Sequence, residues 1–135
     1  IIPTYQKIIS MIHQQTGKPF LLHSCGHIFD VMDDLIDTAK IDAKHSNEDS
    51  IAPFHKWVEL YGDRICNLGG IDMNVLCQQT PEEIRDKVNG CIAENIECGG
   101  FGLGTGNSVP DYIPVEGFYA MLNTANAYRL SQYGG

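Results

Sequence analysis

Phe20-Leu21-Leu22-His23-Ser24-Cys25-Gly26 places a short apolar run directly before a histidine, a cysteine and a glycine. An apolar run bounded by polar residues and glycine is typical of a short buried strand. Comparable runs begin near residues 41, 64 and 99, so the chain contains four candidate strands. Polar residues or glycines follow each run, which predicts a loop at the end of every strand.

Apolar residues recur at helical spacing before the first candidate strand and after each of the four. Gly17 follows the first of these segments and predicts its end. Thr80-Pro81-Glu82-Glu83 has the pattern of a capping box, and Pro53 and Pro114 suit the first positions of two further helices. The periodic residues are Tyr5, Ile8, Ile9 and Ile12; Ile28, Val31, Met32, Leu35 and Ile36; Phe54, Trp57, Val58 and Tyr61; Ile84, Val88 and Ile92; and Phe118, Met121, Leu122 and Ala125.

This order, one helix and then four strand–helix units, is typical of a parallel sheet with helical crossovers. Four strands are half of an eight-stranded barrel, which in complete form takes about 250 residues. We therefore predict an α/β fold, the C-terminal half of a (β/α)8 TIM barrel with four parallel strands and outer helices. Residues 1–135 would be part of a longer domain, which the lack of an initial methionine supports. A complete flavodoxin-like domain is the alternative.

The composition argues against several classes of protein. A formal net charge of −8 disfavours binding to nucleic acid and to an anionic membrane surface. No apolar run is long enough to span a membrane. The five cysteines are odd in number and irregularly spaced, which favours free thiols in a reducing cytoplasm. Four of them are expected to be small buried hydrophobic residues.

His23 and Cys25 are the residues whose spacing suggests chemistry. Residues two apart on an extended chain point the same way, so an imidazole nitrogen and a sulfur can face one point. Imidazole and thiolate are ligands that zinc prefers. A buried cysteine beside a pocket histidine is the alternative interpretation.

Further candidates lie at the other strand ends, where α/β proteins carry their active sites. His45 ends the second strand, and Asp72 follows the third, where its carboxylate could accept a proton. The glycines of the last two strand ends would allow a ligand close to the backbone. The structural alternatives are a polar loop after His45, a turn with a capping Asp72, and a tight glycine loop. The glycines in question are Gly69, Gly70, Gly104 and Gly106.

Several of these segments together resemble the uroporphyrinogen decarboxylase superfamily, and they occur in order over nearly the whole chain. The fold of that superfamily is a (β/α)8 barrel, and the order of elements matches its last four units. The segments are Leu22-His23-Ser24-Cys25-Gly26 with Met32-Asp33-Asp34-Leu35-Ile36-Asp37, Tyr61-Gly62-Asp63-Arg64 with Gly69-Gly70-Ile71-Asp72, Thr80-Pro81-Glu82-Glu83, and Gly99-Gly100-Phe101-Gly102-Leu103-Gly104.

The superfamily has two chemical branches. One decarboxylates uroporphyrinogen without a cofactor, and its last strand ends in Gly-His-Gly, where this chain has Gly104-Thr105-Gly106. The other contains zinc-dependent methyltransferases whose metal site begins His-x-Cys, which His23 and Cys25 match. Their third ligand is a cysteine after the last strand, and the matching position here is Asn107.

The resemblance therefore implies a corrinoid-dependent methyltransferase. It would pass a methyl group between a methylcorrinoid protein and a small-molecule acceptor, a thiol or another, with Zn²⁺ on His23 and Cys25. His45, Asp72 and Asn107 are then the candidate catalytic residues, and the four glycines named above the candidate cofactor-binding residues. Tetrapyrrole decarboxylation and a non-catalytic module that docks a corrinoid protein are the alternatives.

Overall fold

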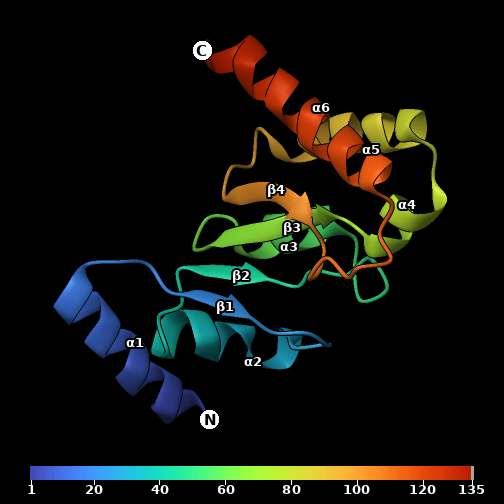
Figure 1. Ribbon diagram of the computed structural model, residues 1–135. Helices are drawn as coiled ribbons and strands as arrows, with labels where there is room; N and C mark the ends of the chain where they lie inside the picture. Colours follow the sequence, from blue (N-terminus) through green and yellow to red (C-terminus); the bar gives the residue numbers. More distant parts are fainter. Residues whose placement is uncertain (135) are drawn as a thin grey trace.

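Four strands in chain order form one parallel sheet in the computed structural model, which describes residues 1–134 (Figure 1). The sheet order is β1-β2-β3-β4. Consecutive strands are neighbours in a barrel, whereas in a flavodoxin-like sheet the first strand lies between the second and the third. The prediction of four parallel strands from a barrel is confirmed, and the flavodoxin-like alternative is wrong. The strands are β1 (Leu21–His23), β2 (Ala43–His45), β3 (Cys66–Ile71) and β4 (Phe101–Thr105).

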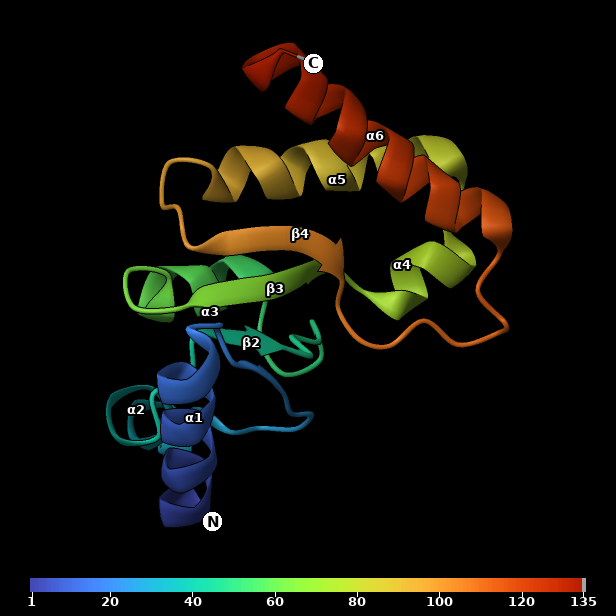
Figure 2. The ribbon, with the colours of Figure 1, turned by 60° about the vertical axis from the view of Figure 1, so that its left-hand side comes forward.

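Helices lie outside the sheet and cover it from one end to the other. Figures 1 and 2 show α1 and α2 at the β1 end and α5 and α6 beyond β4. Within residues 1–134, no helix combines the length and the apolar character that crossing a membrane requires. The helices are α1 (Ile2–Thr16), α2 (Phe29–Asp33), the π-helical η1 (Asp34–Thr38), α3 (Phe54–Tyr61), α4 (Met73–Gln78), α5 (Pro81–Asn95) and α6 (Val115–Tyr133).

Two hydrophobic clusters hold the helices on the sheet, and α3 belongs to both. Phe54 and Val58 of α3 pack with α4, α5 and α6 in the first cluster. Trp57 and Tyr61 pack with α1, α2 and η1 in the second. The periodicity of α3 thus supplies two apolar faces, and this helix joins the two ends of the sheet.

Local signals predicted the end of α1 and the start of α5 correctly. Gly17 ends α1 in the left-handed conformation, with φ of 64°, and Thr80 and Glu83 form the reciprocal bonds of a capping box at the start of α5. Pro53 and Pro114, by contrast, lie one residue before their helices rather than inside them.

Two further details of the prediction were wrong. The third strand does not close at Gly69-Gly70 but continues to Ile71, and α4 follows it immediately. In α6, Leu122 is 43% exposed, because the helix packs through small residues instead. An added Cβ on the buried Gly117 would lie 2.7 Å from the carbonyl oxygen of Leu76 in α4. Close helix contact therefore sets the buried face of α6.

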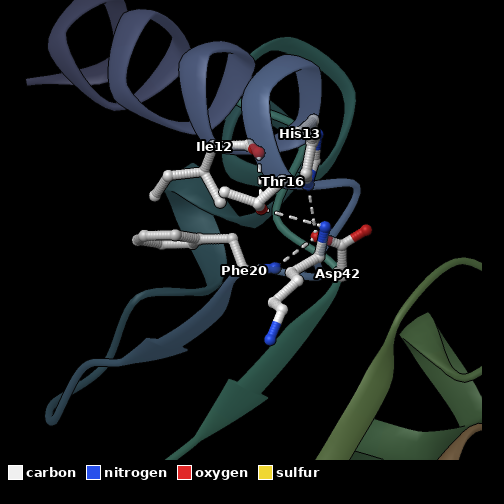
Figure 3. Close-up of polar contacts among 6 residues, drawn as sticks. Ile12, His13, Thr16, Phe20 and Asp42 are labelled. Atoms are coloured by element: carbon white, nitrogen blue, oxygen red, sulfur yellow. Dashed lines mark hydrogen bonds and ion pairs between the residues drawn. The ribbon is translucent and has the colours of Figure 1, made fainter.

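The carboxylate of Asp42 ties α1 to the sheet (Figure 3). Its Oδ2 accepts a hydrogen bond from the backbone N–H of Phe20 over 2.6 Å and lies 2.7 Å from Nε2 of His13. Thr16 closes the end of the same helix by donating to the carbonyl oxygen of Ile12 over 2.8 Å. Asp42 precedes β2 and Phe20 precedes β1, so one side chain fixes the entry of both strands beneath α1.

Removal of the Asp42 carboxylate tests this link. We expect Asp42→Ala to lower the free energy of unfolding by about 1–2 kcal/mol, because Phe20 and His13 lose a shared hydrogen-bond partner. Asp86, exposed on α5, is the matched control, and Asp86→Ala is expected to change the free energy by less than about 0.5 kcal/mol. Urea denaturation followed by circular dichroism measures both, and equal effects of the two substitutions would contradict the link.

Candidate functional site

The histidines at the ends of β1 and β2 lie side by side. The parallel register pairs His23 with His45, and the centroids of their rings are 4.9 Å apart. Nδ1 of His23 lies 2.8 Å from Nδ1 of His45. Because the ends of parallel strands meet at one edge of the sheet, side chains from separate loops become direct neighbours there.

A backbone carbonyl determines how both imidazole rings are protonated. Nε2 of His45 lies 3.0 Å from the carbonyl oxygen of Thr105, which can only accept a hydrogen bond. His45 therefore carries its proton on Nε2, and in the neutral state its Nδ1 accepts the Nδ1–H of His23. It follows that Nε2 of His23 keeps its lone pair, which is the form in which an imidazole binds a metal ion.

The sulfur of Cys25 faces that lone pair. Sγ lies 3.5 Å from Nε2 of His23, and the hydroxyl of Ser46 donates to it over 3.1 Å. Nδ2 of Asn107 approaches the same sulfur to 3.7 Å. The two predicted metal ligands therefore lie together, with a hydroxyl and an amide against the sulfur, and Cys25 itself is exposed.

Glu48 joins the site through Asn107, and sequence analysis missed it. Nδ2 of Asn107 donates to Oε1 of Glu48 over 2.5 Å, while Oδ1 of Asn107 accepts from the backbone N–H of Ser108 over 2.7 Å. The carboxylate of Glu48 is thus one hydrogen bond from the amide that faces the sulfur. Its only signal in the sequence was its place in the polar loop after His45.

Lys44 is a second residue that sequence analysis missed. It lies in β2 and is 0% exposed. Burial lowers the pKa of Lys44 to about 8, while the charges of Cys25 and Glu48 act in the opposite direction. A lysine is almost never fully buried unless it is paired. A lysine inside a predicted apolar strand was therefore the signal that could have found it.

An open, mainly apolar cavity of about 490 Å³ lies beside the two histidines. Of the four predicted cofactor-binding glycines, Gly69 and Gly104 line it. An added Cβ on Gly104 would meet no atom within 4 Å, so the space in front of this part of the wall is open. The remaining lining residues are Leu21, Leu68, Gly102, Leu103 and Thr105.

The other two predicted cofactor-binding glycines, Gly70 and Gly106, are buried against the chain itself. An added Cβ on Gly70 would lie 2.7 Å from Sγ of Cys91 in α5, and one on Gly106 would lie 3.0 Å from the carbonyl oxygen of Asn47. The N–H of Gly106 also donates to the carbonyl oxygen of Ile71 over 2.7 Å. Close packing of the backbone accounts for both glycines.

Asp72 caps α4, the helix that follows β3. Its Oδ1 accepts from the backbone N–H of Asn74 over 2.8 Å, and its Oδ2 accepts from the backbone N–H of Asp49 over 3.2 Å. Both carboxylate oxygens are therefore engaged by backbone donors, as the capping interpretation requires. The bond to Asp49 also fastens the loop that carries Glu48. The catalytic role of Asp72 stays a prediction.

The separation of the two donor atoms fits zinc. A tetrahedral ion with Zn–S of about 2.3 Å and Zn–N of about 2.0–2.1 Å holds sulfur and nitrogen about 3.6 Å apart, and the observed separation is 3.5 Å. Within residues 1–134, however, no three His, Cys, Asp or Glu side chains are grouped so that they could hold a metal ion. Oδ1 of Asn107, the residue that the resemblance aligns with a third ligand, lies 4.0 Å from Sγ of Cys25.

Comparisons with known proteins agree with this architecture. A solved methyltransferase from Methanosarcina mazei superposes with a TM-score of 0.73 at 21% identity, over 95% of this chain and 35% of that one. This chain thus spans about a third of the solved chain's length, and at such identity the likeness shows the fold alone. No curated protein matches the sequence. The family model described as uroporphyrinogen decarboxylase (URO-D) matches residues 1–128, and the chain therefore belongs to the uroporphyrinogen decarboxylase family.

Proposed function

We propose that this chain carries the metal-binding part of a zinc-dependent methyltransferase that works with a corrinoid protein. The observation that supports the proposal best is the 3.5 Å distance between Nε2 of His23 and Sγ of Cys25. When bound, zinc would lower the pKa of an acceptor thiol and the methylcorrinoid would supply the methyl group. The protein's own residues then have to hold, orient and shield the reactants.

Orientation is the task of the histidine pair. The bond from His45 to the carbonyl oxygen of Thr105 fixes the ring of His45, and His45 in turn fixes the ring of His23. Such outer hydrogen bonds determine the tautomer and direction of a metal-binding imidazole. His45 is therefore proposed to act on the metal through His23 and not as a ligand.

Cys25 and the cavity supply the second ligand and the space for an acceptor. Ser46 and Asn107 face the sulfur with hydrogen-bond donors, which stabilise a thiolate. The apolar cavity beside His23, with Gly69 and Gly104 in its wall, would receive the acceptor. Asp72 is proposed to contribute indirectly, by holding the loop that carries Glu48.

Two observations favour methyl transfer over decarboxylation: the fold shared with a methyltransferase and the missing histidine after the last strand. The solved structure with the shared fold is a methyltransferase, and this chain has Gly104-Thr105-Gly106 where the decarboxylases have Gly-His-Gly. A non-catalytic docking module is the second candidate, because Asn107 replaces the third zinc ligand of the methyltransferases and the described residues provide no group of three donors.

The metal content of two cysteine variants tests the ligand role. We expect Cys25→Ser to lower the affinity of the full-length protein for Zn²⁺ at least tenfold, since a soft thiolate ligand is lost. Cys98→Ser is the matched control, because Cys98 is also free and exposed but lies in the loop before β4. Chelator competition and elemental analysis measure both variants, and equal zinc in Cys25→Ser and the parent protein would exclude this role.

Replacement of Asn107, which stands where the methyltransferases have a cysteine ligand, provides a gain-of-function test. Asn107→Cys would place a thiolate at the position of the missing third ligand, so we expect it to tighten Zn²⁺ binding at least tenfold. Asn123→Cys on α6 introduces an equally new thiol away from His23 and is expected to leave the affinity unchanged. If Asn107→Cys binds zinc no more tightly than the parent protein, Asn107 does not face the metal.

Activity distinguishes the three candidate functions. With methylated corrinoid and a series of thiol acceptors, we expect the cobalt absorption spectrum to change in the presence of the full-length protein. Cys25→Ser should slow that change at least a hundredfold, about 2.7 kcal/mol in activation free energy, whereas His55→Ala, exposed on α3, should not. Carbon dioxide release from uroporphyrinogen would favour the decarboxylase instead. Binding of a corrinoid protein without turnover would favour the docking module.

A further inference from the structure

Lys44 points its ammonium group into the loop that follows β2. Nζ donates to Oδ1 of Asn47 over 2.7 Å and to the carbonyl oxygen of Ser46 over 2.9 Å. It also lies 3.5 Å from the carbonyl oxygen of His45 and 4.2 Å from the ring centre of Trp57. The cation is therefore surrounded by oxygens of three consecutive residues and by one aromatic face.

These contacts hold a backbone conformation that serine rarely adopts. Ser46 has φ of +77°, in the left-handed region that costs a residue with a side chain about 1–2 kcal/mol. Such a conformation persists only where the surroundings hold it in place. Lys44 holds the loop through the carbonyl oxygen of Ser46 and the side chain of Asn47. The amide of Asn47 also donates to the carbonyl oxygen of Leu68 in β3 over 3.0 Å.

The conformation of Ser46 has a consequence at the sulfur. The buried side chain of Ser46 donates from Oγ to Sγ of Cys25 over 3.1 Å. Ser46 therefore meets Lys44 through its carbonyl oxygen and Cys25 through its hydroxyl. This makes a continuous path from the buried ammonium to the exposed thiol, through one strained residue.

We propose that Lys44 is a positioning residue, which acts through Ser46 to fix the direction of the Cys25 sulfur towards a metal shared with His23. The inference rests on the proposed zinc site and deepens it. Lys44 itself touches neither ligand. Its effect is to keep the hydroxyl of Ser46 on the sulfur, so that Cys25 needs no reorganisation when a metal binds.

A double-mutant cycle in the full-length protein tests the path. We expect Lys44→Met and Ser46→Ala each to weaken Zn²⁺ binding about tenfold, as outer-shell substitutions do. The double variant should be no weaker than Ser46→Ala alone, because both changes remove the same contact. Lys56→Met, at an exposed lysine on α3 paired with Glu59 over 2.9 Å, is the control. Zinc affinity within twofold of the parent protein in Lys44→Met, or additive losses in the double variant, would overturn the proposal.

A crystal structure of metal-free Lys44→Met separates this inference from the proposed function. We expect Oγ of Ser46 to leave Sγ of Cys25 by more than a hydrogen-bond distance, and an unchanged contact would overturn the inference whether or not the protein binds zinc. If Lys44→Met does not fold, Asn47→Ala takes its place, since it removes the shortest contact of the ammonium while the lysine remains. Asn47→Ala should move Ser46 in the same way, and an unmoved Ser46 would again refute the positioning role of Lys44. A parent protein that binds no zinc would refute the proposed function, and the crystal structure would then decide the inference alone.

Discussion

Parallel pairing in register is the constraint on which the candidate site depends. The pairing of His23 with His45 makes a contact between two imidazoles, and the pairing of β3 with β4 through Ile71 and Thr105 brings the carbonyl of Thr105 to the same edge. A slip of one residue would turn each of these side chains to the opposite face of the sheet. The tautomer of His23, and with it the lone pair that faces Cys25, therefore follows from strand register.

The candidate site also depends on buried polar residues next to this edge of the sheet, namely Lys44, Ser46 and Asn47. An ammonium without partners would cost several kcal/mol to bury, and the oxygens of Ser46 and Asn47 and the ring of Trp57 offset part of that cost at Lys44. Because Trp57 belongs to the hydrophobic cluster shared with α1 and α2, the site rests directly on a core of the domain. The loop after β2 is thus held by packing as well as by hydrogen bonds.

The fold and the chemistry of the site respond differently to a substitution at a strand end. The side chain of Asn107 lies beyond β4, and exchanging it for cysteine would leave the sheet register unaffected. Gly106, the residue before it, has less freedom, because an added Cβ would lie 3.0 Å from the carbonyl oxygen of Asn47, closer than an ordinary contact. Packing therefore restricts Gly106 more than it restricts Asn107, next to the proposed metal ligands.

Local patterns in the sequence determined the strand–helix alternation, the end of α1 at Gly17, the capping box of α5 and the common direction of His23 and Cys25. These features depend on the spacing and backbone preferences of residues close together in the chain. The continuation of β3 through Gly70 could not be predicted, because it depends on pairing with Gly104 and Thr105 of β4. Nor could the contacts of Ser46 with Cys25 and of Glu48 with Asn107, since they arise only when loops far apart in the sequence meet at one edge of the sheet. The oxygens around Lys44 belong to its own loop, but its contact with Trp57 depends on how α3 packs on the sheet. The spacing of residues along the chain thus placed the two proposed ligands, His23 and Cys25, side by side. The tertiary structure alone decided the contacts of His45 and Ser46 that orient them.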